Sequence, residues 1–387
     1  MKRFCIFSAN FIPNLGGIER YTLNLGKELV RMGNQVTVVT SNVFHLANKE
    51  QVENLQVYRI PCFNVLNGRF PVVKPNREFW DLNGELNRQK FDFVIVQARF
   101  YVHSLYAVSF AKKRGIPCIV IEHGTNHFTV NQPVWDFLGH IYEHIITGLV
   151  KRKCGSFYGV SKDCCKWSGH FGIQSKGTLY NAVDLAEIES LQSHPVEDYR
   201  KEYALEDTFV VTYTGRLIRE KGILKLISAV ELLRSEGRNI TLIVAGDGGE
   251  YEELKKQDLS GVCLLGKIDF PHVVSLLSAT DVFCLPSDYS EGFPTSVLEA
   301  AACGCYVVTT SLGGAKELIL DEGYGKILVD NSPETIAEAI RRGMDDPRYR
   351  ENAAKKARQY LSSHFTWEST ARNVLKLCGG SAQSQAK

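Results

Sequence analysis

Two glutamates lie eight residues apart in the segment SDYSEGFPTSVLEA (287–300), the first in a Gly/Pro turn and the second in a predicted helix. Residues four apart share one face of a helix, so Thr295 and Glu299 form one stripe that Glu291 precedes. A carboxylate repels a phosphate but is a strong acceptor for hydroxyl donors. The spacing therefore predicts two hydroxyl-binding carboxylates beside one helix start, as opposed to an ordinary capped helix with an exposed glutamate.

The start of that helix is predicted to bind an anion. Pro294 suits the first helical position, where its missing N–H is not needed. Backbone N–H groups at a helix start lie at the positive end of the helix dipole and attract phosphate. The residues expected around this start are Gly292, Phe293, Pro294, Thr295 and Ser296. One phosphate flanked by two hydroxyl-binding carboxylates fits a nucleotide sugar, with its sugar on one side and its ribose on the other.

Two cations follow the predicted strand TFVVTYTG, within the segment TGRLIREKG. Arg216 and Lys221 are expected at the carboxyl end of this strand, where an open α/β sheet binds ligands. The sequence contains no Asp-x-Asp motif, so no carboxylate pair is evident for a divalent cation. We therefore expect no metal ion and no other cofactor, with Arg216 and Lys221 neutralising a diphosphate. The alternative is a solvated pair of cations at a strand end.

Two further groups of residues lie at strand ends in the first half of the chain. Gly16 and Gly17 follow the first predicted strand and open a helix, so that the backbone can approach a ligand closely. A plain turn would use the same residues. His123 ends the predicted strand CIVIEH before Gly124. A lone histidine there is commonly structural, and the residues alone leave its role open.

Short runs of β-branched and aromatic residues alternate with amphipathic segments along the chain, as is typical of parallel strands covered by helices on both faces. The predicted strands lie in RFCIFSA, QVTVVTS, FDFVIVQ, PCIVIEH, SFYGVS and KGTLYN, and then in TFVVTYTG, ITLIVAG, GVCLLGKI, DVFCLPS, CYVVTTS and GKILVD. We therefore predict an α/β protein with two doubly wound sheets. The aromatic, Pro- and Asn-rich segment 61–80 is predicted to be a long functional loop.

Length and composition are those of a globular protein with two domains: 387 residues, of which 44% are hydrophobic and 23% charged. The start, MKRFCIFSANF, is interpreted as a strand and not as a secretory signal. No segment has the roughly 18 apolar residues of a membrane span. The eleven cysteines lack zinc-site spacing and suit a reducing cytosol. The basic residues come without a nucleic-acid-binding motif, so no nucleic-acid partner is expected.

The net charge of +2 hides an asymmetry between the two halves. Residues 1–180 carry 22 Lys and Arg against 12 Asp and Glu, whereas the remainder carries 23 against 31. Basic runs at 112–114 and 151–153 have aromatic residues nearby in sequence, namely Trp135, Phe137 and Trp167. Cations mixed with aromatics suit an anionic lipid surface. We predict a cytoplasmic protein attached peripherally to the inner face of the cell membrane; a solvated basic face is the alternative.

Taken together, these motifs resemble the retaining glycosyltransferases with the GT-B fold, family GT4 (glycosyl transferases group 1). EGFPTSVLEA is similar to the E-x7-E signature of that family. The other motifs that agree in order and spacing, over residues 1 to about 375, are FIPNLGGIERYTLNLGKEL, EHG, GVSK, LYNAVD, TGRLIREKG, VAGDGGEYEEL and SLGGAKELI. The resemblance implies two doubly wound Rossmann-like domains facing across a cleft.

The domain boundaries combine this resemblance with the strand pattern. The predicted parts are an acceptor-binding domain (1–180), a hinge without strands (181–206), a nucleotide-sugar-binding domain (207–361), a helix packing back toward the N-terminal domain (362–378) and a disordered tail (379–387).

The resemblance also implies roles for single residues. Glu291, Arg216 and Lys221 are expected to be catalytic together with His123, which contacts the transferred sugar. The residues expected to bind the donor are Gly16, Gly17, Arg216, Lys221, Gly292, Phe293, Pro294, Thr295 and Glu299. The implied reaction is a same-face displacement that moves a sugar from a UDP- or GDP-sugar to a hydroxyl acceptor. The basic runs with their neighbouring aromatics predict that this acceptor is a lipid-linked or cell-envelope glycan. A soluble glycosyltransferase acting on a small metabolite or protein, and a non-catalytic nucleotide-sugar-binding protein, are the alternatives.

Overall fold

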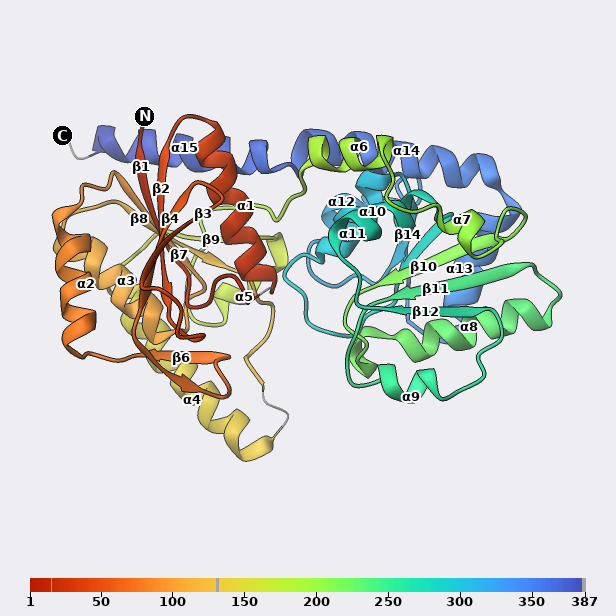
Figure 1. Ribbon diagram of the computed structural model, residues 1–387, viewed down its shortest axis with the longest axis horizontal. Helices are drawn as coiled ribbons and strands as arrows, with labels where there is room; N and C mark the ends of the chain where they lie inside the picture. Colours follow the sequence, from red (N-terminus) through yellow and green to blue (C-terminus); the bar gives the residue numbers. More distant parts are fainter. Residues whose placement is uncertain (15, 130–131, 385–387) are drawn as a thin grey trace. The chain divides into compact units, whose positions relative to one another are not determined.

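The computed structural model describes residues 1–14, 16–129 and 132–384, with side chains described as far as Gly380. The chain divides into two compact units. The first unit comprises Met1–Asn181 together with the segment that begins at Trp367, and the second comprises Ala182–Thr366. Each unit has its own sheet with helices on both faces (Figure 1).

The first unit is built on a sheet with the strand order β3-β4-β2-β1-β7-β8-β9. Its strands are β1 (Arg3–Phe7), β2 (Gln35–Ser41), β3 (Lys49–Val52), β4 (Leu55–Ile60), β7 (Phe93–Gln97), β8 (Cys118–Glu122) and β9 (Phe157–Gly159). The pairs are parallel apart from β3 with β4. Ile6 lies opposite Val38 and Ile95, so β1 is central and apolar on both faces. The strand order reverses between β1 and β7, which is where such sheets bind ligands.

Helices cover both faces of this sheet. They are α1 (Gly17–Arg31), α2 (Arg77–Arg88), α3 (Val102–Lys113), α4 (Pro133–Lys151), α5 (Lys162–Gly169) and α15 (Trp367–Ser384). Figure 1 shows α2, α3 and α4 on one side of the strands and α1 on the other. Leu86, Phe110 and Val150 of α2, α3 and α4 share one core with Phe7 and Val96 of the sheet. This packing of amphipathic helices on a buried parallel sheet stabilises the unit.

The C-terminal helix α15 packs in the first unit against α1. The ring of Tyr21 in α1 contacts the ring of Trp367, with centroids 5.1 Å apart. The hydroxyl of Thr370 in α15 donates a hydrogen bond to the backbone oxygen of Tyr180 at 2.9 Å. The last helix therefore belongs to the first unit, although the chain reaches it only after completing the second.

The second unit has a parallel sheet with the strand order β12-β11-β10-β13-β14-β15. Its strands are β10 (Phe209–Thr214), β11 (Ile240–Ala245), β12 (Val262–Gly266), β13 (Val282–Leu285), β14 (Tyr306–Thr309) and β15 (Lys326–Ile327). From β10 the chain runs outward to β12 and then returns to β13 on the other side of β10. The carboxyl ends of β10 and β13 therefore frame the ligand-binding edge of this sheet.

Helices also cover both faces of the second sheet. They are α6 (Leu185–Ser193), α7 (Tyr199–Glu202), α8 (Ile223–Ser235), α9 (Tyr251–Lys255), α10 (Phe270–Ser278), α11 (Thr295–Cys303), α12 (Ala315–Leu318), α13 (Pro333–Asp345), α14 (Pro347–His364) and the 3-10 helix η1 (Arg219–Lys221). Figure 1 shows α8 on one side of the strands and α10 and α11 on the other. Side-chain caps fix several helix starts: Asp269, Ser332 and Asp346 accept backbone N–H bonds at the starts of α10, α13 and α14.

The strand predictions hold with a few exceptions. In KGTLYN only Thr178 pairs, in an isolated bridge to Gly159. The strands β3 and β4 were not predicted, and the prediction of a long loop at 61–80 is wrong. That segment contains an antiparallel hairpin of β5 (Cys62–Val65) and β6 (Phe70–Val73), followed by α2. The aromatic residues are there partly for packing, since the Phe70 ring lies 5.2 Å from the Tyr142 ring of α4.

The boundaries also differ from the predicted ones. The segment predicted as the hinge contains α6 and α7 and, after Asn181, belongs to the second unit. It is held there by packing and hydrogen bonds, including one at 3.1 Å from Gln192 to the backbone oxygen of Cys303. The last helix begins at Trp367 and is helical through Ser384, where a disordered tail was predicted from 379. Residues 385–387 lie outside the described residues.

Candidate active site

Three of the predicted catalytic residues follow β10 and β13 in the second unit. Arg216 lies two residues after β10, Lys221 ends η1 in the same connection, and Glu291 lies in the connection after β13. The Lys221 Nζ and the Glu291 Oε1 are 2.5 Å apart, in an ion pair whose side chains are 11% and 16% exposed. The structure therefore brings a predicted phosphate-binding cation directly against a predicted hydroxyl-binding carboxylate.

A glycine makes this approach possible. Gly222 follows Lys221 with φ +77°, and a Cβ built on it would lie 2.1 Å from the backbone oxygen of Pro286. Only a residue without a side chain lets the η1 turn pack this closely on the connection after β13. The backbone N–H of Asp288 donates to the oxygen of Glu220 at 2.7 Å and joins the same two connections.

The connection after β13 is braced by a carboxylate. Asp288 Oδ2 accepts hydrogen bonds from Lys225 at 2.9 Å and from Asn331 at 2.6 Å. Partial burial opposes ionisation, but these two donors lower the pKa of the Asp288 carboxyl group below its ordinary value. The loop that carries Glu291 is therefore held by charged hydrogen bonds at neutral pH.

An aromatic ring that sequence reasoning missed joins the two cations. The Arg216 guanidinium carbon lies 5.0 Å from the centre of the Tyr289 ring, and Lys221 Nζ lies 5.9 Å from it. The Tyr213 hydroxyl donates to the backbone oxygen of Arg216 at 2.8 Å, which fixes the start of the turn. Tyr289 stands two residues before Glu291 in the signature segment. Its position in a loop after a strand was the signal that could have identified it.

The end of β10 contributes one more polar group. The hydroxyl of Thr214 is buried and has no hydrogen-bond partner among the described residues. It precedes Gly215 and Arg216 at the carboxyl edge of the sheet. A buried hydroxyl at this edge is a further candidate for contact with a ligand.

The predicted helix start is present, with one correction. Pro294 is the residue that caps α11, with φ −61° and ψ 117°, and Thr295 is the first helical residue, so the placement of Pro294 at the first helical position is wrong by one. Thr295 and Glu299 are partly exposed on the same face of α11, as the spacing predicts. Phe293 has a structural role: it is buried, and its ring packs 5.2 Å from Phe365.

The connection after β14 packs against this helix start. The backbone N–H of Gly314 donates to the oxygen of Gly292 at 3.1 Å. A Cβ on Gly314 would lie 2.3 Å from the Phe293 ring, and one on Gly313 would lie 2.5 Å from the oxygen of Glu291. The two glycines in SLGGAKELI therefore allow the backbones of two neighbouring connections to meet.

The predicted residues of the first unit lie at the carboxyl edge of its own sheet. Gly16 caps α1 and Gly17 begins it. A Cβ on Gly16 would lie 2.5 Å from Glu19 Oε2, because this carboxyl group folds back over the helix start and accepts from Asn14 at 3.1 Å. Burial raises the pKa of Glu19. A Cβ on Gly17 would meet no described atom within 4 Å, so the chain itself leaves room there.

His123 follows β8 and faces the end of β7. Its Nε2 lies 2.7 Å from Gln97 Oε1, and its ring meets the Tyr21 ring edge-on at 4.9 Å. Burial lowers the pKa of His123 to about 3, so the imidazole is neutral at neutral pH. The side-chain nitrogen of Gln97 is buried and has no partner among the described residues. A neutral imidazole beside an unpaired amide donor can bind hydroxyl groups.

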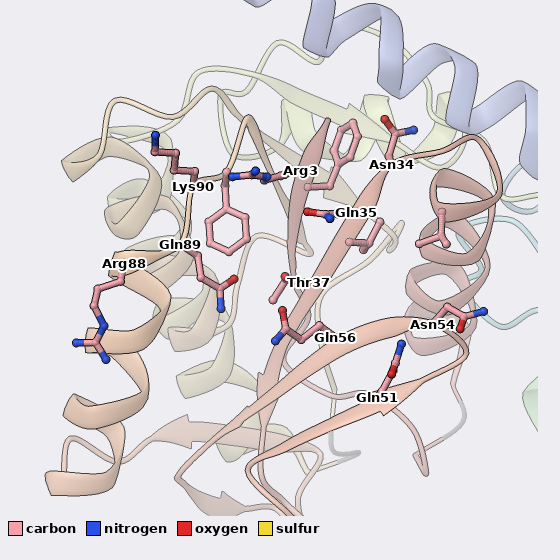
Figure 2. A pocket seen from close by; sticks show the side chains of 14 residues that line it. Arg3, Asn34, Gln35, Thr37, Gln51, Asn54, Gln56, Arg88, Gln89 and Lys90 are labelled. Atoms are coloured by element: carbon pink, nitrogen blue, oxygen red, sulfur yellow. The ribbon is translucent and has the colours of Figure 1, made fainter. Parts of the chain in front are cut away.

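A pocket of about 780 Å³ in the first unit lies elsewhere (Figure 2). Arg3, Gln35 and Lys90, which line it, stand at the amino ends of β1, β2 and β7. Ligands of doubly wound sheets bind at the carboxyl ends of the strands. We therefore assign this pocket neither to a donor nor to an acceptor.

Two family models match the chain on either side of residue 190. The model described as glycosyltransferase family 4 matches residues 15–187, and the model described as glycosyl transferases group 1 matches residues 195–360. The second match contains Arg216, Lys221 and Glu291, and the first contains Gly16, Gly17 and His123. This chain belongs to the family 4 glycosyltransferases.

Relatives of this glycosyltransferase cover nearly its whole length. It is 27% identical to an uncharacterised glycosyltransferase of Methanocaldococcus jannaschii over 97% of each chain. It is also 27% identical to a putative teichuronic acid biosynthesis glycosyltransferase, TuaC, of Bacillus subtilis, over 82% of each chain. The crystal structure of HepE from Anabaena, in complex with UDP, matches 98% of this chain and 100% of its own with a TM-score of 0.76 and 18% identity. The fold is therefore GT-B, with two Rossmann-like domains.

Proposed function

We propose that this glycosyltransferase moves a sugar from a nucleoside-diphosphate sugar to a hydroxyl acceptor with retention of anomeric configuration and without a metal ion. The observation that carries the proposal is the group at the carboxyl edge of the second sheet, where Arg216 and Lys221 lie beside one Tyr289 ring. Fixed cations at such an edge stabilise the charge that develops on a departing diphosphate. The donor would therefore bind the second unit through its phosphates.

The Lys221–Glu291 pair suggests how the donor enters. In the chain by itself the Lys221 ammonium group is bound to the Glu291 carboxylate at 2.5 Å. A diphosphate carries more charge than a carboxylate and would draw Lys221 toward itself. Glu291 would then accept a hydroxyl of the transferred sugar, and Glu299, eight residues along, a hydroxyl of the ribose.

The proposed chemistry is a same-face displacement. The bond between the anomeric carbon and the diphosphate oxygen breaks, and a bond to the acceptor oxygen forms on the same face. The acceptor proton passes to the departing phosphate oxygen, so no protein base is needed. Arg216, Lys221 and the start of α11 stabilise the diphosphate. His123 and Gln97, at the edge of the first sheet, are suited by themselves to binding hydroxyl groups.

The donor base is proposed from the structural neighbour. HepE of Anabaena has been solved with UDP and with UDP-glucose. We propose a UDP-sugar as the first donor to test and a GDP-sugar as the second. A thermal-shift panel of nucleotide sugars would show which one binds, because a ligand that binds only the folded state raises the melting temperature.

The decisive experiment measures sugar transfer in Arg216→Ala. Removing one fixed cation should lower kcat about 10²- to 10³-fold. Arg219→Ala is the matched control, since Arg219 lies in the same connection but is 78% exposed and paired with Glu250. Equal rates in wild type and Arg216→Ala would overturn the proposal, as would loss of activity with a chelator and its return with Mg²⁺. Donor binding without transfer in the wild type would instead favour the non-catalytic alternative.

A lipid-linked or cell-envelope acceptor is the second part of the proposal, and α4 supports it. Its exposed apolar residues are Val134, Trp135, Phe137, Leu138, Ile141 and Ile145. An exposed stripe of this size on one helix is typical of a surface that meets a membrane or a partner. The relative TuaC, named for teichuronic acid biosynthesis, is in keeping with an envelope glycan. Across the described residues, the helices are too short or too polar to cross a membrane.

The sequence predicted that the two basic runs would mix with aromatic residues on one surface. Several of their side chains instead donate hydrogen bonds to backbone oxygens of the first unit. Arg114 donates to the backbone oxygens of Leu86 and Gln89, and Lys151 donates to that of Phe171 at 2.8 Å. Lys112 reaches the backbone oxygen of Arg152 at 3.4 Å, so the two runs meet at the C-terminal end of α4. The apolar stripe starts at the other end of this helix, which is about 28 Å long.

Sedimentation with anionic vesicles at low salt tests the membrane proposal. Phe137→Asp should lower the bound fraction about tenfold or more, because one buried aromatic side chain contributes roughly 1.5–3 kcal/mol. Arg152→Glu, at the far end of α4, should change it less. Absence of wild-type binding at low salt would overturn the membrane proposal and favour a soluble acceptor, while leaving the donor chemistry intact.

A further inference from the structure

Three histidines from separate segments converge in the first unit, and none of them has a role in the function proposed above. His127 follows β8, His144 lies in the middle of α4, and His170 directly follows α5. One ring nitrogen from each lies within 4.8 Å of the other two. The nitrogens His127 Nε2 and His170 Nε2 are 3.2 Å apart. Their spacing in the sequence is not that of a zinc motif, because these residues meet only in the folded chain.

The spacing of these nitrogens suits a shared metal ion. Zinc–nitrogen bonds of 2.0–2.1 Å at tetrahedral angles place two ligand nitrogens about 3.3 Å apart. The ring centres are 5.0 Å apart for His127 and His170, 5.1 Å for His144 and His170, and 5.7 Å for His127 and His144. The three imidazoles therefore lie close enough together to share an ion, and His144 and His170 are exposed to solvent.

A buried carboxylate orients the first of these histidines. His127 Nδ1 lies 2.6 Å from Glu143 Oε2, and the Glu143 side chain is 3% exposed. A carboxylate in this place keeps the proton on Nδ1 and leaves the lone pair of Nε2 directed at the cluster. Metal-binding histidines nearly always have such an outer partner. Glu143 also binds Arg99, with Arg99 Nη2 2.5 Å from Glu143 Oε1, so the carboxylate is itself fixed.

We propose that His127, His144 and His170 bind a divalent transition-metal ion, with Zn²⁺ as the best-suited ion. Nitrogen ligands select Zn²⁺, Ni²⁺ or Cu²⁺ over Mg²⁺, which prefers oxygen. This ion is separate from the diphosphate chemistry, which the cations of the second unit serve. The binding proposal does not depend on the proposed reaction.

The site has a structural connection to His123. Arg99 Nη1 donates to Glu122 Oε2 at 2.8 Å, and Glu122 Oε1 accepts the backbone N–H groups of His123 and Gly124 at 3.0 Å. A metal ion on His127 therefore stabilises a chain of buried contacts that ends at the turn carrying His123. The ion positions this turn and does not touch the reacting atoms.

An alternative arrangement needs no metal. His170 could donate a hydrogen bond to His127 within an aromatic cluster, where its ring already stacks on Trp167 with centroids 4.8 Å apart. The two arrangements differ in what they predict for added metal. A purely aromatic cluster binds no ion at low micromolar concentration, whereas three converging imidazoles do.

The test uses the full-length chain without a polyhistidine tag, stripped with a chelator and desalted. Titration with Co²⁺, followed by visible absorption, and with Zn²⁺, followed by calorimetry, should show one ion per chain. His144→Ala and His170→Ala should each lower the affinity at least tenfold. His140→Ala is the matched control, since His140 lies one turn before His144 and stacks on His127 at 4.1 Å, yet lies outside the three-histidine group.

Two outcomes would overturn the metal site: no binding by the wild-type chain at micromolar metal, or equal affinity in wild type and in both ligand variants. A melting temperature raised by Zn²⁺ in wild type and in His140→Ala, but not in His144→Ala, would support it. None of these readouts requires sugar transfer, so a failed transfer assay leaves them interpretable.

Discussion

The carboxyl edges of the two sheets carry different groups: two cations in the second unit and a neutral histidine in the first. In the second unit, Arg216 and Lys221 lie against one aromatic ring, and Glu291 holds Lys221 directly. In the first unit, His123 is neutral because burial lowers its pKa to about 3, and it faces an uncharged amide. The comparison indicates that one edge is suited to a diphosphate and the other to uncharged hydroxyl groups.

An arginine near each edge differs in its burial. Arg216 is exposed, whereas Arg99 is fully buried between Glu122 and Glu143. The charge of Arg99 is therefore neutralised inside the protein by these two carboxylates. Part of the basic excess of residues 1–180 is of this kind and does not face an anionic partner.

Arg99→Ala is expected to have the largest effect on stability. If it were harmless, the contrast between a buried structural arginine and the exposed Arg216 would be wrong. Removing Arg99 leaves two buried carboxylates without a counter-charge, which should lower the free energy of unfolding by about 3–5 kcal/mol. Urea unfolding followed by fluorescence measures this. Arg99→Lys keeps the charge and should lose less, and the exposed Arg152→Ala should change little. A loss under about 1 kcal/mol for Arg99→Ala would mean that the pairings contribute little.

Lys221→Ala tests the cationic edge by activity. Loss of this ammonium group should lower kcat about 10²- to 10³-fold, or roughly 2.7–4 kcal/mol of transition-state stabilisation, while the free energy of unfolding changes much less. Lys256→Ala, whose side chain is 71% exposed in the same unit, should retain wild-type kinetics. A raised KM with unchanged kcat would show that Lys221 binds the ground state only.

Two neutral histidines of the first unit, His103 and His123, predict that the free energy of unfolding falls in acid. Burial lowers the pKa of His103 to about 4 and that of His123 to about 3, below the ordinary value near 6.5. Between about pH 6.5 and 4 these histidines are protonated in the unfolded chain but neutral in the folded chain. The free energy of unfolding therefore falls as pH drops from about 6.5 toward 4. Each contributes at most about 1.4 kcal/mol per pH unit. Urea unfolding of His123→Gln should show a shallower slope of stability against pH than wild type; parallel slopes would contradict a neutral, partly buried His123.

Tyr289→Leu is expected to have the smallest effect. It tests whether the face of the Tyr289 ring helps to hold Arg216 and Lys221. Losing the cation–π contacts of Arg216 and Lys221 should cost about 0.5–2 kcal/mol, seen as a roughly 2- to 30-fold loss in kcat/KM for the donor. Tyr289→Phe keeps the ring and should behave as wild type. If Tyr289→Phe fell as far as Tyr289→Leu, the hydroxyl and not the ring face would be responsible.

The sequence by itself determined most of the parallel strands of both sheets, the order of the motifs and the residue types at the ends of β1, β8, β10 and β13, but not β3, β4 or the β5–β6 hairpin. Two local rules account for this. Parallel strands buried on both faces read as short apolar runs, and their carboxyl ends share one edge of a sheet. These rules placed Arg216, Lys221, Glu291 and His123 after strand ends, without indicating which of them would pair.

Only the tertiary structure decided which side chains meet. The ion pair of Lys221 with Glu291 joins residues 70 positions apart and depends on how Gly222 packs on Pro286. The enclosure of Arg99 and the meeting of His127, His144 and His170 likewise join separate connections. Such contacts are set by the packing of helices on the sheet, which no local sequence period encodes.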